Sequence, residues 1–378
     1  MNQAPFVTPA QMIEAQLRER GWSQRTLAKV LGMSEQSVSS LMKGRTKIST
    51  ELALQLREVL GIEADDLLKL QASFELKKAE LEFRLDPALN TRAMVFGDIP
   101  VGDMIARGWL KGVDDLWDSR LNESLCRFFG VSSVEEIEIL PHAAKKTDVT
   151  GDATPTQITW LYRVKQIAQQ TLVAKYSQSA VADAVKNLKP LLNSVEAARK
   201  VPKILAESGI RFVIVESLPS AKIDGVCFWL DDKSPVIGMT LRFDRIDNFW
   251  FVLRHELEHV IRKHGQSAAM LDISLEGEKA GTGALIPEEE RVANEAAAEF
   301  CVPQKQLKHF IQVKFPFFAE RDIRGFAATY KIHPGVVAGQ LQHKTERYDL
   351  FRNHLVKIRS VVTPNAMVDG WGDVAPIG

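Results

Sequence analysis

Cysteine is scarce in this chain of 378 residues. The three cysteines, Cys126, Cys227 and Cys301, lie far apart and form no CxxC pair. A disulfide framework or a cysteine zinc site needs several closely placed cysteines, so the sequence argues against both. Such low cysteine usage fits a reducing compartment, and we expect a cytoplasmic protein.

Long apolar runs and an excess of charge of one sign are also missing. No apolar stretch approaches the roughly 20 residues that span a bilayer, and the opening MNQAPFVTPAQMIEAQ has no signal-peptide pattern. The 48 basic and 48 acidic side chains cancel, so any DNA contact must come from a local patch. We expect a soluble protein of about two to four domains, without membrane contact.

Helix start and stop signals divide the first 75 residues. Ser23 caps QRTLAKVL and Ser34 caps EQSVSSLM, and each helix ends at a glycine. Two short helices joined by Gly-Met-Ser predict a helix-turn-helix, whose second helix fits a major groove. Further helices are expected to begin at Thr8 and at Thr50.

Charge and polarity in this segment favour DNA contact. Residues 8–62 carry eight basic and five acidic side chains, a net charge of +3. Basic side chains just past the second helix suit phosphate contacts, and small polar side chains on it suit base edges or water. A helical packing module that never contacts DNA is the alternative. The candidate DNA-binding residues are Gln24, Ser34, Gln36, Ser37, Ser39, Ser40, Lys43, Arg45 and Lys47.

The same segment resembles the helix-turn-helix of the XRE class, and specifically HigA-type antitoxins. The matching letters are SQ at 23–24, LA at 27–28, LG at 31–32, VS at 38–39, Gly44, ELALQLREVLG at 51–61 and LKLQASFEL at 68–76. The resemblance implies an autorepressor that binds an operator in double-stranded DNA and also holds a toxin of HigB type. Paired half-sites in DNA further predict a homodimer.

The middle of the chain, residues 76–196, shows helical spacing of apolar residues. Its tryptophans, Trp109, Trp117 and Trp160, are expected in the core rather than in a base-stacking platform. The polar stretch 145–157 predicts a loop, and His142 is interpreted as a surface residue.

A candidate metal site lies in the run FWFVLRHELEHVIRKHG, which follows three strand-like runs, GIRFVIVES, GVCFWL and PVIGMTLRF. On a helix from about Asn248 to Gly265, His255 and His259 lie one turn apart on one face, so both imidazoles can bind one cation. Glu256 is rotated to the side, which suits a general base beside a zinc ion. A charged helix face without metal is the alternative.

A third ligand is expected from the later helical run PEEERVANEAAAEFCVP. Glu290 is the favoured ligand, because Asn294, one turn later, can hold a histidine nitrogen behind the metal. The acidic candidates in this run are Glu288, Glu289, Glu290, Glu295 and Glu299. Ala293, Ala297 and Ala298 leave room for close helix packing. Three other histidines receive no role in the metal site: His264 and His309 are interpreted as solvated or capping residues, and His333 as part of a turn.

Residues 201–342 resemble the ImmA/IrrE family of zinc metallopeptidases. The family pattern of HExxH, ExxAN and a terminal proline is matched by His255, Glu256, His259, Glu290, Ala293, Asn294 and Pro303. Glu258 departs from the family's usual glycine, which predicts added negative charge near the metal and a crowded substrate approach. The run GFAATYKIHPGVVAGQLQHK resembles a second, small helix-turn-helix-like element.

These patterns predict an α+β fold that is mostly α. We expect a helix-turn-helix domain at 1–75, a helical region at 76–196, a metallopeptidase-like domain with a small sheet at 197–310 and a helical element at 311–378. The predicted function is a DNA-binding repressor and antitoxin with a zinc peptidase-like domain and a peptide substrate. One alternative is a regulator whose peptidase-like domain is a non-catalytic sensor, or a module that binds the toxin or dimerises. Another is a plain repressor.

Overall fold

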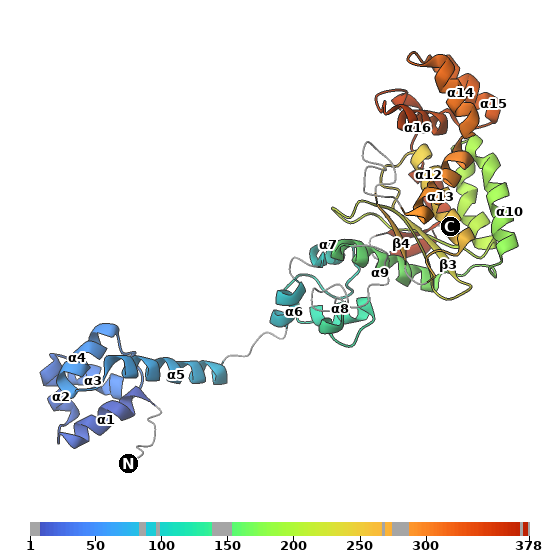
Figure 1. Ribbon diagram of the computed structural model, residues 1–378. Helices are drawn as coiled ribbons and strands as arrows, with labels where there is room; N and C mark the ends of the chain where they lie inside the picture. The colour runs from blue at the N-terminus through green and yellow to red at the C-terminus, as the bar shows by residue number, and fades with distance from the viewer. Residues whose placement is uncertain are drawn as a thin grey trace. The chain divides into compact units, whose positions relative to one another are not determined.

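The computed structural model describes residues 8–82, 88–95, 99–137, 153–266, 269–273, 287–370 and 373–376. The chain divides into two compact units, Met1–Asp86 and Pro87–Gly378. Helices dominate both, and a single mixed sheet lies in the second (Figure 1). The predicted α+β, mostly α, fold class is confirmed. No described helix is long and apolar enough to cross a membrane.

The first unit is a bundle of five described helices, and the first four of them begin at side-chain caps. Ser23 and Ser34 accept backbone hydrogen bonds as predicted. Thr8 forms a capping box with Gln11. Helix α4 begins at Thr50, as predicted, but its cap is Ser49 rather than Thr50, because Ser49 accepts the hydrogen bond from the Leu52 amide. The helices are α1 (Pro9–Glu19), α2 (Gln24–Leu31), α3 (Glu35–Met42), α4 (Thr50–Leu60) and α5 (Ala64–Glu82).

Apolar residues at helical spacing close this bundle around one core. Ile13, Leu27, Val38 and Leu56 are fully buried, and they come from four different helices. Their packing fixes α2 against α3 and leaves the polar side of α3 exposed.

The second unit contains the remaining described helices and every strand among the described residues. Its helices are α6 (Ala88–Val95), α7 (Val101–Ala106), α8 (Leu121–Phe129), α9 (Pro155–Gln170), α10 (Gln178–Leu188), α11 (Val201–Glu207), α12 (Ile246–Arg262), α13 (Glu288–Cys301), α14 (Gln304–Lys314), α15 (Glu320–Tyr330), α16 (Pro334–Thr345) and α17 (Arg359–Val362). Its strands are β1 (Arg211–Ile214), β2 (Ile223–Trp229), β3 (Pro235–Met239), β4 (Met270–Ile273), β5 (Met367–Gly370) and β6 (Asp373–Pro376).

The sheet has the order β4-β2-β3-β1-β5-β6, with β1 parallel to β3 and β5 and the other pairs antiparallel. The three runs predicted as strands are β1, β2 and β3. Both faces of these strands are buried, because helices cover each side (Figure 1). Alternate residues therefore enter different cores: Cys227 packs with α12, whereas Val226 and Phe228 pack with α8 and α9.

The middle helices α7, α8 and α9 share the core that contains Val226 and Phe228 of β2. Trp109 and Trp160 are buried, as predicted, among residues of α7, α8 and α9. Trp117 contradicts the prediction, because its side chain is 73% exposed and lies under the Arg92 guanidinium. Of the predicted loop at 145–157, residues 153–157 are described and Pro155 already starts α9; the rest, like His142, lies outside the described residues.

A buried ion pair ties β5 to the middle helices. Asp369 accepts hydrogen bonds from Arg163 at 2.6 Å and from the Trp109 indole at 2.6 Å. The side chains of Asp369 and Arg163 are almost fully buried. The middle helices of the second unit and the sheet are therefore joined by a charged contact as well as by a shared apolar core.

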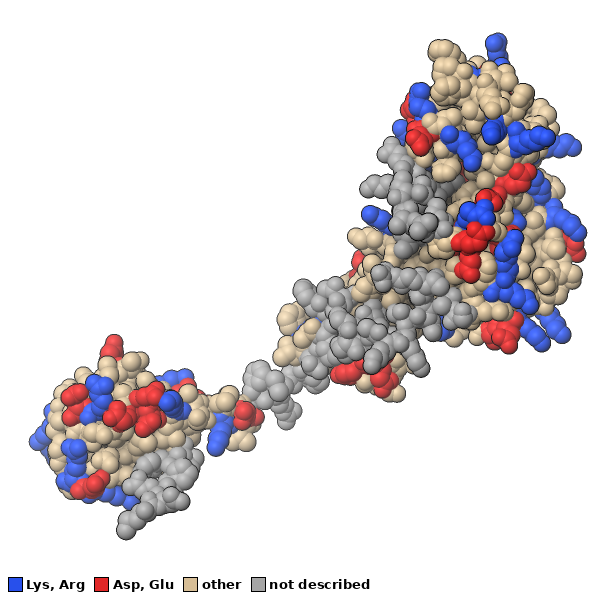
Figure 2. Space-filling model, viewed as in Figure 1, with Lys and Arg blue, Asp and Glu red and all other residues tan. Residues whose placement is uncertain are grey.

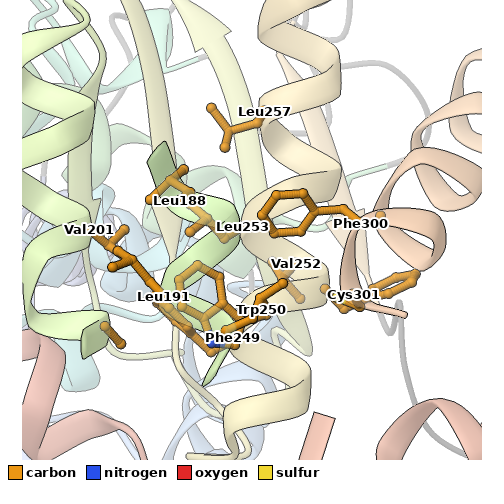
Figure 3. Packing of buried hydrophobic residues seen from close by; sticks show 14 of the residues in the cluster. Leu188, Leu191, Val201, Phe249, Trp250, Val252, Leu253, Leu257, Phe300 and Cys301 are labelled. Carbon is orange, nitrogen blue, oxygen red and sulfur yellow. The ribbon is translucent and has the colours of Figure 1, made fainter. Parts of the chain in front are cut away.

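Helix α12 lies inside the second unit with its surface covered almost all round. Figure 3 shows Phe249, Trp250 and Leu253 of α12 packed against Leu188 of α10 and Phe300 of α13. A helix buried on all sides is an unusual place for charged residues, since a buried charge needs a partner. The polar residues of HELEH therefore require a structural explanation.

Candidate metal centre and DNA-binding helices

Three side chains from α12 and α13 converge at one point. His255 and His259 present their Nε2 atoms to each other at 3.0 Å, and both rings are fully buried. Glu290 of α13 places one carboxylate oxygen 3.2 Å from His255 Nε2 and the other 3.6 Å from His259 Nε2. The ligating atoms of all three residues lie within 4.8 Å of one another.

The hydrogen bonds behind the rings reveal what this point can hold. Asn294 Oδ1 lies 3.1 Å from His255 Nδ1. A carbonyl oxygen only accepts, so His255 Nδ1 carries the proton and its Nε2 presents a lone pair. With His259 oriented in the same way, two lone pairs and a carboxylate face one another, which is a favourable arrangement only around a cation. Two imidazoles and a carboxylate fit zinc.

Glu256 is fully buried beside this point. Its carboxylate lies over Gly225 of β2: a Cβ atom at Gly225 would stand 2.0 Å from Glu256 Oε1 and 2.9 Å from Val252 Cγ1. The carboxylate position therefore depends on a glycine in the neighbouring strand. No sequence pattern points to Gly225, because nothing along the chain shows which strand faces the helix.

His264 also lies at the site, although the sequence analysis gave it no role there. Its Nδ1 atom is 2.9 Å from His259 Nδ1. The available signal was its position, five residues after His259 and one before the glycine that the sequence predicts as the helix end. His309, in contrast, is exposed on α14, in line with the solvated interpretation, and His333 caps α16 by accepting a hydrogen bond from the Gly335 amide.

In the first unit, α2 and α3 form the predicted pair of short helices. The side chains of Gln24, Gln36 and Ser37 are exposed, and those of Ser39 and Ser40 are half-buried. Lys43, Arg45 and Lys47 follow α3 and are all exposed. On the face in view in Figure 2, basic and acidic side chains are intermixed over this unit, so a DNA-binding surface depends on local placement.

Comparisons with known proteins agree with both halves of this arrangement. A helix-turn-helix family model matches residues 13–67, and the model of the IrrE N-terminal-like domain matches residues 206–341. A curated relative, Virulence-associated protein I of Dichelobacter nodosus, is 30% identical over 80 residues, which make up 21% of this chain and 74% of the relative. The chain belongs to the helix-turn-helix family. No solved structure matches it.

Within the helix-turn-helix unit, three of the predicted DNA-binding residues have structural partners: Ser34, Ser37 and Lys47. Ser34 Oγ caps α3, where it accepts the Ser37 amide at 3.1 Å and contacts the Ser37 hydroxyl at 2.7 Å. Lys47 pairs with Glu75 of α5 at 2.7 Å. These contacts compete with DNA for the three side chains, whereas Gln36 and Lys43 are exposed.

In the IrrE-like domain, Glu258 has a different environment from the one expected. Its carboxylate accepts hydrogen bonds from Arg254 at 2.8 Å and from Arg262 at 2.7 Å. Burial alone would raise the pKa of Glu258, but the two arginines outweigh it and lower that pKa below its ordinary value. The expected excess of negative charge near the metal is wrong, because two cations compensate this carboxylate.

The second helix-turn-helix-like element of the IrrE-like domain corresponds to α15 and α16. Residues 335–342 of α16 are buried without interruption. Gly339 lies so close to α12 that a Cβ atom there would stand 2.2 Å from Asp247 Oδ2. A helix buried on all sides cannot enter a DNA groove, so α16 supports the HELEH helix rather than reading DNA.

Proposed function

We propose that this protein is a DNA-binding transcription repressor whose second unit is a zinc-dependent metallopeptidase. The observation that carries the proposal is the convergence of His255, His259 and Glu290 within 4.8 Å beside the buried Glu256. The helix-turn-helix family and the IrrE-like domain support its two halves.

The metal site would be held by three protein ligands. His255, His259 and Glu290 supply the nitrogen and oxygen atoms that zinc binds, and this number of protein ligands is typical of hydrolytic sites. Bound zinc would supply a Lewis acid that acidifies water and polarises a peptide carbonyl. Asn294 fixes the tautomer of His255, so that the nitrogen presented to the site is unprotonated.

Glu256 would act as the proton carrier of the reaction. It is adjacent to His255 in sequence, its carboxylate is withdrawn from solvent, and the neighbouring Gly225 leaves space for its Oε1 atom. A buried carboxylate in this place can take a proton from the attacking water and give it to the leaving amine.

The helix-turn-helix unit would bring this domain to an operator. Gln36 on α3 is exposed and suits contact with a base edge, and Lys43 and Arg45 suit phosphate contacts at the end of the same helix. The resemblance to HigA-type antitoxins extends the proposal to an antitoxin that acts as a homodimer and binds a toxin of HigB type.

The zinc half is tested first by metal analysis of the purified chain, then by the variant Glu256→Gln. We expect about one zinc per chain in both proteins. Cleavage of a peptide library, read by mass spectrometry, should occur in the wild type and fall by at least about 100-fold in the variant. Equal cleavage by the variant would contradict the role of Glu256, and a zinc-free wild type would contradict the metal site.

The DNA half is tested by footprinting on the promoter region of the protein's own gene. Protection by the full chain, and its loss when residues 1–75 are removed, is the expected result. Undiminished protection by the truncated chain would contradict the assignment of the helix-turn-helix unit. Co-purification of a co-expressed HigB-type toxin, compared with the same truncated chain, tests the antitoxin role.

A further inference from the structure

We propose that His264 is a positioning residue of the zinc site: it accepts a hydrogen bond from His259 and thereby holds the Nε2 atom of that ligand toward the metal. The inference rests on the proposed function, since it concerns the same metal. It adds a residue that lies outside the HExxH and ExxAN patterns and that the sequence analysis interpreted as solvated.

The geometry places a hydrogen-bonding partner behind the ring of each histidine ligand. His255 Nδ1 faces Asn294 Oδ1 at 3.1 Å, and His259 Nδ1 faces His264 Nδ1 at 2.9 Å. The rings of His259 and His264 have centroids 5.2 Å apart and an angle of 52° between their planes. His264 thus occupies for one ligand the place that Asn294 occupies for the other.

The direction of the hydrogen bond follows from the ligand role of His259. A neutral imidazole has one protonated nitrogen, and the nitrogen that binds a metal must be unprotonated. With Nε2 of His259 directed at Glu290 and His255, its Nδ1 carries the proton and donates. His264 Nδ1 then accepts, and the proton of the His264 ring sits on its Nε2 atom.

The end of α12 folds His264 back onto the preceding turn. Lys263 adopts a left-handed conformation with φ of 61°, and the His264 amide donates to the His259 carbonyl at 2.9 Å. This is the usual hydrogen-bond pattern of a helix end with a left-handed residue. It brings the side chain of His264 to that of His259 without any long-range contact.

Strand β2 then fixes this turn in place. The Trp229 indole donates to the His264 carbonyl at 2.9 Å. A Cβ atom at Gly265 would stand 2.7 Å from the Cys227 carbonyl oxygen, so the chain passes β2 at a distance that only glycine allows. The backbone on both sides of the imidazole is therefore held, as a positioning role requires.

Two variants of the full-length chain separate a hydrogen-bond acceptor from a space-filling ring. His264→Phe keeps an aromatic ring and removes the acceptor, whereas His264→Asn keeps an acceptor oxygen near the position of Nδ1 and removes the ring. His309→Ala, at an exposed histidine of α14, is the matched control. The readout is the dissociation constant of zinc, measured by competition with a chromophoric chelator, with thermal unfolding of the zinc-free proteins as a check on folding.

We expect zinc to bind about 10–100-fold more weakly to the Phe variant and within a few-fold of wild type to the Asn variant and the control. Wild-type affinity in the Phe variant, or equal losses in the Phe and Asn variants, would overturn the role of His264 and leave the proposed function intact. A wild-type chain that takes up no zinc would overturn the proposed function and this inference with it.

The tautomer supplies a second readout on the folded wild-type protein. Long-range nitrogen–proton NMR spectra of the zinc-loaded chain should show His264 with an unprotonated Nδ1 and a protonated Nε2. Because this measurement uses no variant, it does not depend on whether the substituted chains fold. A proton on His264 Nδ1 would reverse the hydrogen bond and overturn the inference.

Discussion

Gly225 offers a perturbation that reaches Glu256 from the neighbouring strand without touching any ligand. A Cβ atom at this position would stand 2.0 Å from Glu256 Oε1, whereas ordinary contact begins at 3.4 Å. The substitution Gly225→Ala therefore requires a movement of 3.4 − 2.0 = 1.4 Å between the methyl group and the carboxylate. The added methyl group cannot move away toward α12 either, because Val252 Cγ1 would stand 2.9 Å from it.

Two magnitudes follow from this overlap. Overpacking of a buried site typically costs about 1–3 kcal/mol of unfolding free energy, which lowers the melting temperature by about 2–4 °C for each kcal/mol in domains of this size class. A displacement of about 1 Å in a catalytic group costs on the order of 100-fold in rate. We expect both effects in Gly225→Ala, with zinc affinity within a few-fold of wild type because His255, His259 and Glu290 keep their positions.

The assay compares thermal unfolding, zinc affinity and peptide cleavage in Gly225→Ala and Gly325→Ala. Gly325 lies in the exposed part of α15, and a Cβ atom there meets nothing within 4 Å. Alanine at that helical position should raise stability by about 0.5–1 kcal/mol. The two variants thus carry the same chemical change, but their expected changes in stability have opposite signs. The comparison therefore removes any general effect of replacing glycine by alanine.

A melting temperature of Gly225→Ala equal to or above that of wild type would refute the packing argument. Full cleavage activity in a destabilised Gly225→Ala protein would refute the second step, in which the placement of Glu256 limits the reaction. Loss of zinc from this variant would show instead that the ligands moved with Glu256, contrary to the geometry.

Three further predictions concern other parts of the chain. Asp369→Asn leaves the buried Arg163 without a counter-charge, so the free energy of unfolding in urea should fall by about 3–5 kcal/mol. The control Asp183→Asn, in the exposed pair with Lys186, should lose less than about 1 kcal/mol. Equal losses in the two variants would contradict this. Burial and a neighbouring histidine lower the pKa of His333 below 6.5, so its contribution to stability is complete above that pH and is lost as the pH falls toward the lowered pKa. His333→Asn retains a helix cap without titrating, and wild type should lose stability relative to it between about pH 7.5 and about pH 5.5; parallel pH profiles would contradict this. Lys43→Ala should lower the number of ions released on binding a short duplex DNA, measured as the slope of log affinity against log salt concentration, by about one. Lys47→Ala should lower this slope less, because Lys47 pairs with Glu75. A larger effect of Lys47→Ala than of Lys43→Ala would contradict this.

Helix boundaries in the first unit were predictable because their causes are local. Ser23 and Ser34 accept hydrogen bonds from amides three residues later, and the glycines that follow α2 and α4 adopt the left-handed conformation. The error at Thr50 has the same local character. Two adjacent hydroxyl residues can both cap, and only the backbone conformation shows that Ser49 does so.

Long-range contacts were predicted less well. Trp117 has the same residue type and similar surroundings in sequence as Trp109, yet it is exposed while Trp109 is buried against Asp369, 260 positions later. The charge expected from Glu258 is compensated by arginines one turn away on either side, a contact that helical spacing permits but does not require.

For the proposed metal site, the sequence by itself determined the candidate ligands. A spacing of four residues puts His255 and His259 on one helix face, and the acidic run that follows Pro287 limits the third ligand to a few residues. Only the tertiary structure decided that Glu290 faces both imidazoles, that Gly225 makes room for Glu256 and that His264 returns to His259. The physical reason is that ligand spacing repeats along one helix, whereas the groups behind and beside a ligand come from whichever strand or turn the packing of the core brings there.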